Sequence, residues 1–336
     1  MSLLKEASEN TVANITEGHL VMPHYRQSLP QLDGTVFLTD GGLETTLVFV
    51  DGMDLPCFAS FPLISNEVGR QRLRDYFAPY VSAAKACSAG FILGSPTWRA
   101  NADWGAKLGY DREALADINK KSIEFLATLR DDYVSDGMQV VIEGVIGPRG
   151  DGYRPDARMT AAEAEHYHRE QIAIFSDTEA DMVSAYTLNY PEEAIGLAKA
   201  ARSLKIPIAI SFTVETDGRL PSGDLLAAAI EQVDTATDSA PAYFMINCAH
   251  PSHFESVLET NEPWLGRVYG IRANASKKCH AELDSATQLD AGDPLELAKD
   301  YQMLRAHLPH LSVLGGCCGT DHRHVEAIGR ACLIPS

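Results

Sequence analysis

The feature that most constrains the fold is a series of eight short, apolar, β-rich runs along the chain. Most are continuously apolar instead of alternating in polarity, which is typical of strands buried on both faces of a parallel sheet. Longer stretches with helical spacing, such as residues 112–133 and 161–180, separate the runs. The runs cover residues 35–42, 90–95, 139–147, 181–188, 206–214, 242–249, 267–274 and 311–318.

Eight strand–helix units of roughly 35–40 residues each predict a single (β/α)8 TIM barrel. The alternative is an open doubly wound sheet, but DGGLETT after the first run lacks the G-x-G-x-x-G spacing of its phosphate-binding turn. No repeat, low-complexity tract or linker divides the chain. We therefore expect one barrel domain over residues 35–336, preceded by a polar N-terminal extension over residues 1–34.

The charge balance narrows the classes of partner. The chain has 46 acidic and 28 basic residues and a formal charge of −18, which disfavours binding to nucleic acid or to an anionic membrane. It has no run of about 18 apolar residues and no apolar signal segment in its first 30 residues. The expected location is cytoplasmic, and a homo-oligomer is compatible with the sequence.

Three of the seven cysteines lie at the ends of predicted strands, where the active site of a barrel enzyme is expected. The odd number of cysteines favours free thiols or metal ligands over a disulfide framework. In a TIM barrel the active site lies at the carboxyl ends of the strands. Cys248 ends the sixth run, and Cys317 and Cys318 end the eighth. Only one strand separates the sixth run from the eighth, so the three thiols can converge.

Three thiolates match a catalytic zinc site, which usually has three protein ligands and one open position. Adjacent cysteines bind one ion only where the strand has ended and the backbone turns, and Gly315, Gly316 and Gly319 permit such a turn. The alternative is that each cysteine is a small buried apolar residue. A disulfide between Cys317 and Cys318 is disfavoured by strain and by a reducing compartment.

Four histidines lie near these cysteines in the sequence. His250 and His253 follow Cys248 and are secondary candidates for metal or substrate contacts. His322 and His324 lie on the last helical stretch, where we expect them to face solvent.

Several motifs together resemble the homocysteine S-methyltransferase family. They are D-G-G-L-E-T-T-L, I-x-G-P, S-F-T-x-E-x-D-G-R-L-x-x-G, N-C-A-H-P and G-G-C-C-G-T, in that order from about Asp40 to Arg330. The resemblance implies a zinc-dependent (β/α)8 enzyme that methylates the sulfur of homocysteine to give methionine. It also implies that Cys248, Cys317 and Cys318 bind one zinc per chain. Asp40, Gly41, Gly42 and Asn247 would contact the amino-acid substrate.

The methyl donor implied by the resemblance is a small activated molecule such as S-methylmethionine, S-adenosylmethionine or betaine. A cationic donor suits an acidic, aromatic-lined mouth because cations are attracted to aromatic faces. Trp98, Trp104, Tyr186 and Phe212 are the candidates for that wall. For each of them the alternative is simple packing.

One position departs from the family pattern. Many members end the fourth strand with Glu-Thr, and that glutamate binds the ammonium group of homocysteine; here the pair is Tyr186-Thr187. Glu215, Glu143 and Glu44 are the candidate replacements, and Glu215 is favoured because its strand borders the vacated position. The departure leaves open a different thiol or selenol acceptor, or a homologue that binds a thiol metabolite without turnover.

Overall fold

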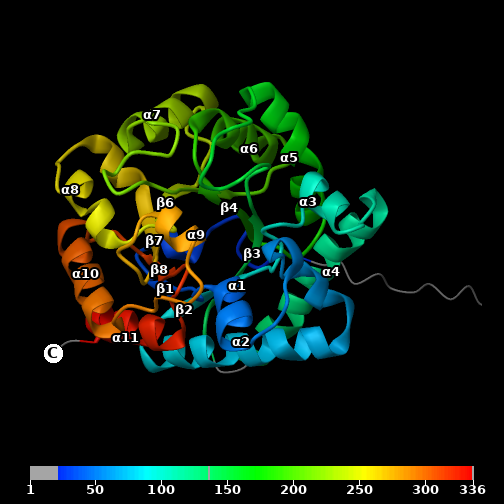
Figure 1. The fold of residues 1–336 in the computed structure, drawn as a ribbon, viewed down its shortest axis with the longest axis horizontal. Helices are drawn as coiled ribbons and strands as arrows, with labels where there is room; N and C mark the ends of the chain where they lie inside the picture. Colours follow the sequence, from blue (N-terminus) through cyan, green and yellow to red (C-terminus); the bar gives the residue numbers. More distant parts are fainter. Residues whose placement is uncertain (1–21, 135–136, 335–336) are drawn as a thin grey trace, which may run out of the picture.

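Eight parallel strands close into a barrel in chain order (Figure 1). The computed structural model describes residues 22–134 and 137–334. Strand β8 pairs back onto β1, so the sheet has no free edge, which confirms the TIM barrel and excludes the open sheet. The strands are β1 Phe37–Leu38, β2 Gly90–Gly94, β3 Val140–Ile146, β4 Met182–Leu188, β5 Ile208–Phe212, β6 Tyr243–Asn247, β7 Val268–Ala273 and β8 Val313–Gly316.

Helices surround the strands as an outer ring (Figure 1). Side-chain caps set several of their starts: Asn66 accepts from the Gly69 amide, and Thr160 forms a capping box with Glu163. The long helices are α2 Glu67–Ala86, α4 Arg112–Val134, α5 Ala161–Ser176, α6 Pro191–Ser203, α7 Leu226–Thr237, α10 Pro294–His307 and α11 His322–Leu333.

Shorter helical segments lie in the connections. They are α1 Leu43–Thr45, α3 Ala102–Lys107, α8 Glu255–Leu258 and α9 His280–Asp284, with single turns η1 Pro30–Leu32, η2 Thr46–Val50, η3 Pro56–Phe58, η4 Phe61–Ser65, η5 Pro251–His253 and η6 Pro263–Arg267. Both α1 and α9 lie near the centre of the view, over the barrel (Figure 1).

The core has two layers, as expected for strands buried on both faces. One layer fills the space between the strands and the outer helices. The other fills the barrel interior and includes Phe37, Ile92, Val141, Met182, Tyr243, Met245 and Val313. Side chains alternate between the two layers along each strand.

The described part of the N-terminal extension closes the amino-terminal end of the barrel. The side chain of Gln31 is fully buried and donates to the hydroxyl of Tyr243, the first residue of β6, at 3.3 Å. Arg26 donates to the backbone carbonyls of Ser176, Thr178 and Ala180. Residues 22–34 therefore pack against the barrel, while residues 1–21 of the expected extension lie outside the described residues.

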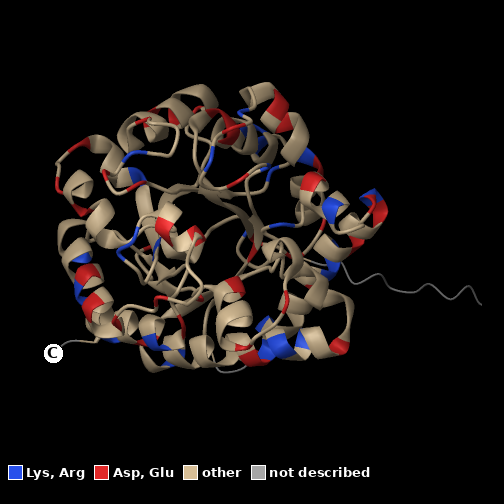
Figure 2. Cartoon of the chain, viewed as in Figure 1, with Lys and Arg blue, Asp and Glu red and all other residues tan. Residues whose placement is uncertain are grey.

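Charged side chains are mainly on the outer helices and the loops (Figure 2). Acidic residues also lie near the barrel centre, where α9 carries Glu282 and Asp284. Among residues 22–134 and 137–334, no helix combines the length and apolarity needed to cross a bilayer.

Candidate active site

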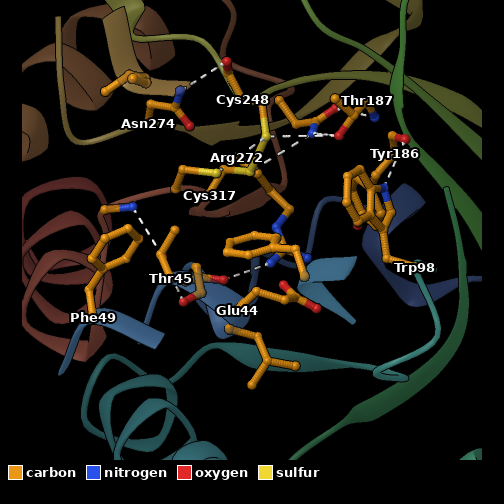
Figure 3. Close-up of a pocket in the computed structure, with 18 of the residues that line it drawn as sticks. Glu44, Thr45, Phe49, Trp98, Tyr186, Thr187, Cys248, Arg272, Asn274 and Cys317 are labelled. Atoms are coloured by element: carbon orange, nitrogen blue, oxygen red, sulfur yellow. Dashed lines mark hydrogen bonds between the residues drawn. A yellow bond between two sulfur atoms is a disulfide. The ribbon is translucent and has the colours of Figure 1, made fainter. Parts of the chain in front are cut away.

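A cavity of about 420 Å³ opens at the carboxyl ends of the strands. This is the end of a TIM barrel where catalytic residues lie. The cavity brings together residues from β2, β3, β4, β6 and β7 and from the loops that follow β1, β3 and β8, among others (Figure 3). Its lining includes Asp40, Gly41, Gly42, Glu44, Trp98, Tyr186, Asn247, Cys248, Arg272, Cys317 and Cys318.

The three predicted cysteines converge in this cavity. Their sulfur atoms all lie within 4.8 Å of one another, and the Sγ atoms of Cys248 and Cys318 are 4.0 Å apart. Cys248 follows β6 with a left-handed φ of 55°, which turns its side chain away from the strand direction. Gly319, just after the cysteine pair, has a φ of 82°, a conformation that favours glycine.

Cys248 and Cys317 form a disulfide in the structure, with Cα atoms 5.4 Å apart (Figure 3). The expectation of free thiols is therefore wrong for this pair. The physical reason is the convergence itself, because a Cα separation of 5.4 Å lies within the range that a disulfide requires. Cys318 and the four remaining cysteines, Cys57, Cys87, Cys279 and Cys332, are free.

Gly315 and Gly316 have a different role from the one predicted. Both lie in β8 and not in a turn. A side chain at Gly315 would collide with Thr39, and one at Gly316 would collide with Thr320. These glycines let the cysteine-bearing strand pack closely against its neighbours.

Asn247 and Thr187 hold the cysteine loops in position. The Asn247 side chain accepts from the Thr187 amide at 2.9 Å and from Ser211 Oγ at 2.7 Å, and donates to Thr187 Oγ1 at 2.9 Å. The side-chain nitrogen Nδ2 of Asn247 is 3.9 Å from Cys317 Sγ, and Thr187 Oγ1 is 3.8 Å from Cys248 Sγ. Polar hydrogens thus face two of the sulfurs.

Cys318 is surrounded differently. Burial raises the pKa of its thiol to about 11, and the negative charge of Glu44 adds to that rise, whereas a hydrogen bond with Tyr153 opposes it. The Tyr153 ring stacks on His280 with centroids 4.3 Å apart. Tyr153 was not identified from the sequence, because nothing in the pattern places a loop residue beside a strand end.

A buried ion pair lies beside the sulfurs. Arg272 on β7 donates to Asp40 Oδ1 at 2.6 Å and to the carbonyl oxygens of Gly41 and Gly316 at 3.2 and 3.0 Å. The Tyr76 hydroxyl donates to the other Asp40 oxygen at 3.1 Å. Burial raises the pKa of Asp40, and the charge of Arg272 opposes that rise. Arg272 was also missed as a site residue.

Tyr186, which the family resemblance led us to expect in place of a glutamate, lines the cavity, and a carboxylate lies behind it. Its hydroxyl donates to Glu143 Oε1 at 2.9 Å, and Ser184 Oγ donates to the other oxygen. Glu143 is only 1% exposed and does not line the cavity. Burial raises the pKa of Glu143, and the positive charge of Arg272, 3.8 Å away, opposes that rise.

The other two candidate acids are in different places. Glu44, in α1, lines the cavity, and its carboxylate accepts from Ser60 Oγ at 2.6 Å. Glu215, the favoured candidate, lies outside the cavity lining, in a turn where its amide donates to the Arg219 carbonyl at 2.7 Å.

The expected aromatic wall is only partly formed. Trp98 and Tyr186 line the cavity, and Trp98 Nε1 donates to the Tyr186 carbonyl at 3.3 Å. Trp104 lies outside the lining, with Arg99 and Lys107 over its ring, and Phe212 is fully buried in the outer layer. Phe49, Phe58 and Tyr153 complete the wall.

The histidines do not join the sulfur cluster. His250 Nδ1 pairs with Ser252 Oγ at 2.9 Å, and His253 Nε2 with the Lys277 carbonyl at 2.9 Å. The prediction that His324 faces solvent is wrong: its side chain is fully buried, because Asp321 and the Ala291 carbonyl satisfy its two ring nitrogens.

Known proteins are similar in sequence over most of this chain. The sequence profile described as "Homocysteine S-methyltransferase" matches residues 37–332. Homocysteine S-methyltransferase 4 of Zea mays is 22% identical over 330 residues, covering 89% of this chain and 90% of the maize protein. Homocysteine S-methyltransferase 2 of Arabidopsis thaliana is 21% identical and covers 70% of this chain and 77% of its own length.

Solved structures share the fold. The oxidized form of the homocysteine methyltransferase MmuM from Escherichia coli superposes with a TM-score of 0.70 at 19% identity, covering 88% of this chain and 95% of MmuM. The metallated form gives 0.69 at 18% identity, covering 89% and 98%. Since the family profile matches residues 37–332, this chain belongs to the homocysteine S-methyltransferase family.

Proposed function

We propose that this protein is a zinc-dependent methyltransferase that transfers a methyl group from a small activated donor to the thiol of homocysteine, giving methionine. The observation that carries the proposal is the convergence of Cys248, Cys317 and Cys318 in a cavity at the barrel mouth. The family relationship and the names of the maize and Arabidopsis relatives support the same reaction.

The spacing of one sulfur pair matches a tetrahedral zinc site. With Zn–S distances of about 2.3 Å, two sulfurs on a tetrahedral ion are about 3.8 Å apart. Cys248 Sγ and Cys318 Sγ are 4.0 Å apart. Thiolates are soft ligands that favour zinc over magnesium or calcium. The Cys248–Cys317 disulfide has to be reduced before both residues can bind, so we propose a reducing compartment, the cytoplasm, as the location.

The acceptor needs activation because a free thiol, with a pKa of about 8.5, is mostly protonated at neutral pH. When bound, zinc lowers the pKa of a thiol that occupies its open position, which makes the thiolate available. Asn247 and Thr187 orient two of the cysteine sulfurs by donating polar hydrogens toward them.

The methyl transfer depends on aligning the acceptor sulfur with the methyl group of the donor, and it needs no protein nucleophile. The acceptor sulfur attacks the methyl carbon in line, the bond from that carbon to the donor breaks, and the donor leaves with the electron pair. The thiol proton is released. The carboxylate of Asp40 and the backbone of Gly41 and Gly42 are the proposed contacts for the amino-acid end of homocysteine.

We propose a cationic donor such as S-methylmethionine, S-adenosylmethionine or betaine. Phe49, Tyr153 and Trp98, whose ring has the Arg99 guanidinium 4.2 Å from its centroid, provide aromatic surface in the cavity, and the exposed Asp151 and Asp284 provide negative charge. Both features attract sulfonium and quaternary ammonium groups.

A different thiol or selenol acceptor is the second candidate function. It is favoured by one observation, the phenol of Tyr186 in the cavity lining, where the family resemblance implies a carboxylate.

The test is a panel of donors offered with homocysteine to zinc-loaded, reduced protein, with methionine as the readout. We expect turnover with at least one cationic donor. Methylation of other thiols or selenols without methionine formation would favour the second function, and absence of any methyl transfer would contradict both.

A further inference from the structure

The cavity contains several carboxylates, and most are already neutralised or screened. Asp40 is paired with Arg272 at 2.6 Å. Glu143 is sealed behind Tyr186. Asp290 is paired with Lys278 at 3.1 Å. Asp151 and Asp284 line the outer part of the cavity but are exposed, so water screens their charges.

Glu44 is the exception within the described part of the chain. Its carboxylate lines the cavity, is half-buried, and forms no ion pair with any described residue. Ser60 Oγ donates to one of its oxygens at 2.6 Å, and no described side chain donates a hydrogen bond to the other. Burial raises the pKa of Glu44, whereas the hydrogen bond from Ser60 and the charge of Arg272 oppose that rise.

The backbone holds Glu44 next to the cysteines. The amide of Gly42 donates to the Thr320 carbonyl at 3.1 Å, and Thr45 Oγ1 accepts from the Gly319 amide at 3.3 Å. A side chain at Gly42 would lie 2.6 Å from the Cys317 carbonyl oxygen. The turn that carries Glu44 is thus fastened on both sides to the loop that carries Cys317 and Cys318, and Figure 3 shows Glu44 pointing into the cavity.

We propose that Glu44 is the specificity residue that binds the ammonium group of the acceptor amino acid. This inference rests on the proposed function. An ammonium group would form an ion pair with a half-buried carboxylate that has none with the described residues and that interacts with the charges of Arg272 and Arg99 only beyond ion-pair distance. It would also lie close to the sulfur cluster that receives the thiol. The chain would therefore select thiol amino acids over thiols that carry a carboxylate alone.

The test compares homocysteine with 4-mercaptobutyrate, which is homocysteine without its ammonium group. Glu44→Gln keeps an oxygen that can accept from Ser60 but removes the charge. Dissociation constants by calorimetry on zinc-loaded, reduced protein and KM values with a working donor are the two readouts. Zinc content and melting temperature show that each variant is folded and loaded.

For the wild type we expect homocysteine to bind roughly 10- to 100-fold more tightly than 4-mercaptobutyrate, as for a hydrogen bond between charged groups. Glu44→Gln should abolish that preference by weakening homocysteine binding, with little effect on 4-mercaptobutyrate. The matched control Glu259→Gln, at an exposed position after α8, should retain the preference.

The outcomes separate this inference from the proposed function. Turnover with homocysteine and an unchanged preference in Glu44→Gln, or loss of the preference in Glu215→Gln instead, would overturn the role of Glu44 alone. A Glu44-dependent preference in binding without any methyl transfer would support the role of Glu44 and overturn the proposed reaction. Absence of homocysteine binding to the wild type would overturn both.

Discussion

At the scale of single residues, the cysteine trio leads to a direct prediction about metal content. Cys318→Ser and Cys317→Ser should each lose the zinc that we expect at one ion per chain, because an uncharged hydroxyl is a poor substitute for a thiolate ligand. Metal analysis of protein purified under reducing conditions measures this. We expect at least a tenfold loss of zinc affinity, comparable to or larger than the effect of altering an outer-shell partner.

Cys332→Ser is the matched control, because Cys332 is a free cysteine on α11 and is not in the sulfur cluster. It should retain full zinc. Full zinc retention in both Cys317→Ser and Cys318→Ser would show that these residues are not the ligands.

Residue types at strand ends were predictable from the sequence, but side-chain directions were not. Phe212 and Ser211 are neighbours on β5 and point to opposite faces. Ser211 faces the barrel interior and binds Asn247, so Phe212 faces the helices and cannot line the cavity. Glu143 and Tyr186 both point inward from adjacent strands, which hides one behind the other. Predicting this requires the register of the barrel, which one sequence does not contain.

At the scale of elements, the apolar runs predicted all eight strands, with the differences confined to their ends. The first run covers residues 35–42, but β1 pairs only over Phe37–Leu38, because the chain turns at Asp40 into the loop that carries Glu44. The glycines of β8 were predicted to make a turn. They instead lie in the strand and allow close packing, which depends on neighbours distant in sequence.

The close packing of β8 predicts a cost for adding a methyl group there. Gly316→Ala should destabilise the protein by about 1–3 kcal/mol. Gly316 lies in the buried strand β8, and the added Cβ would overlap the side chain of Thr320. The shift should also weaken zinc binding, because Cys317 is the next residue. The midpoint of urea unfolding and the zinc content measure the two effects.

Gly150→Ala is the control for this substitution. No atom lies within 4 Å of a Cβ built at Gly150. Its stability should stay within about 0.5 kcal/mol of the wild type. Equal midpoints for Gly316→Ala and Gly150→Ala would show that β8 has room for a side chain.

At the scale of the whole molecule, the residues of the candidate active site and those that close the base of the barrel lie at opposite ends of the strands. The cavity lies at the carboxyl ends of the strands, and the segment around Arg26 and Gln31 closes the amino ends. In TIM barrels the first end carries catalysis and the second carries stability. Changes at the base should therefore affect folding and leave the site intact.

Arg26→Ala tests this separation. The guanidinium donates to the carbonyls of Ser176, Thr178 and Ala180 at 2.6–3.1 Å, so its removal leaves these acceptors without that partner. We expect a loss of about 1–3 kcal/mol in the free energy of unfolding. Zinc content and the KM for homocysteine should remain those of the wild type. A large change in KM with unchanged stability would instead mean that the base of the barrel is coupled to the cavity through the inner core.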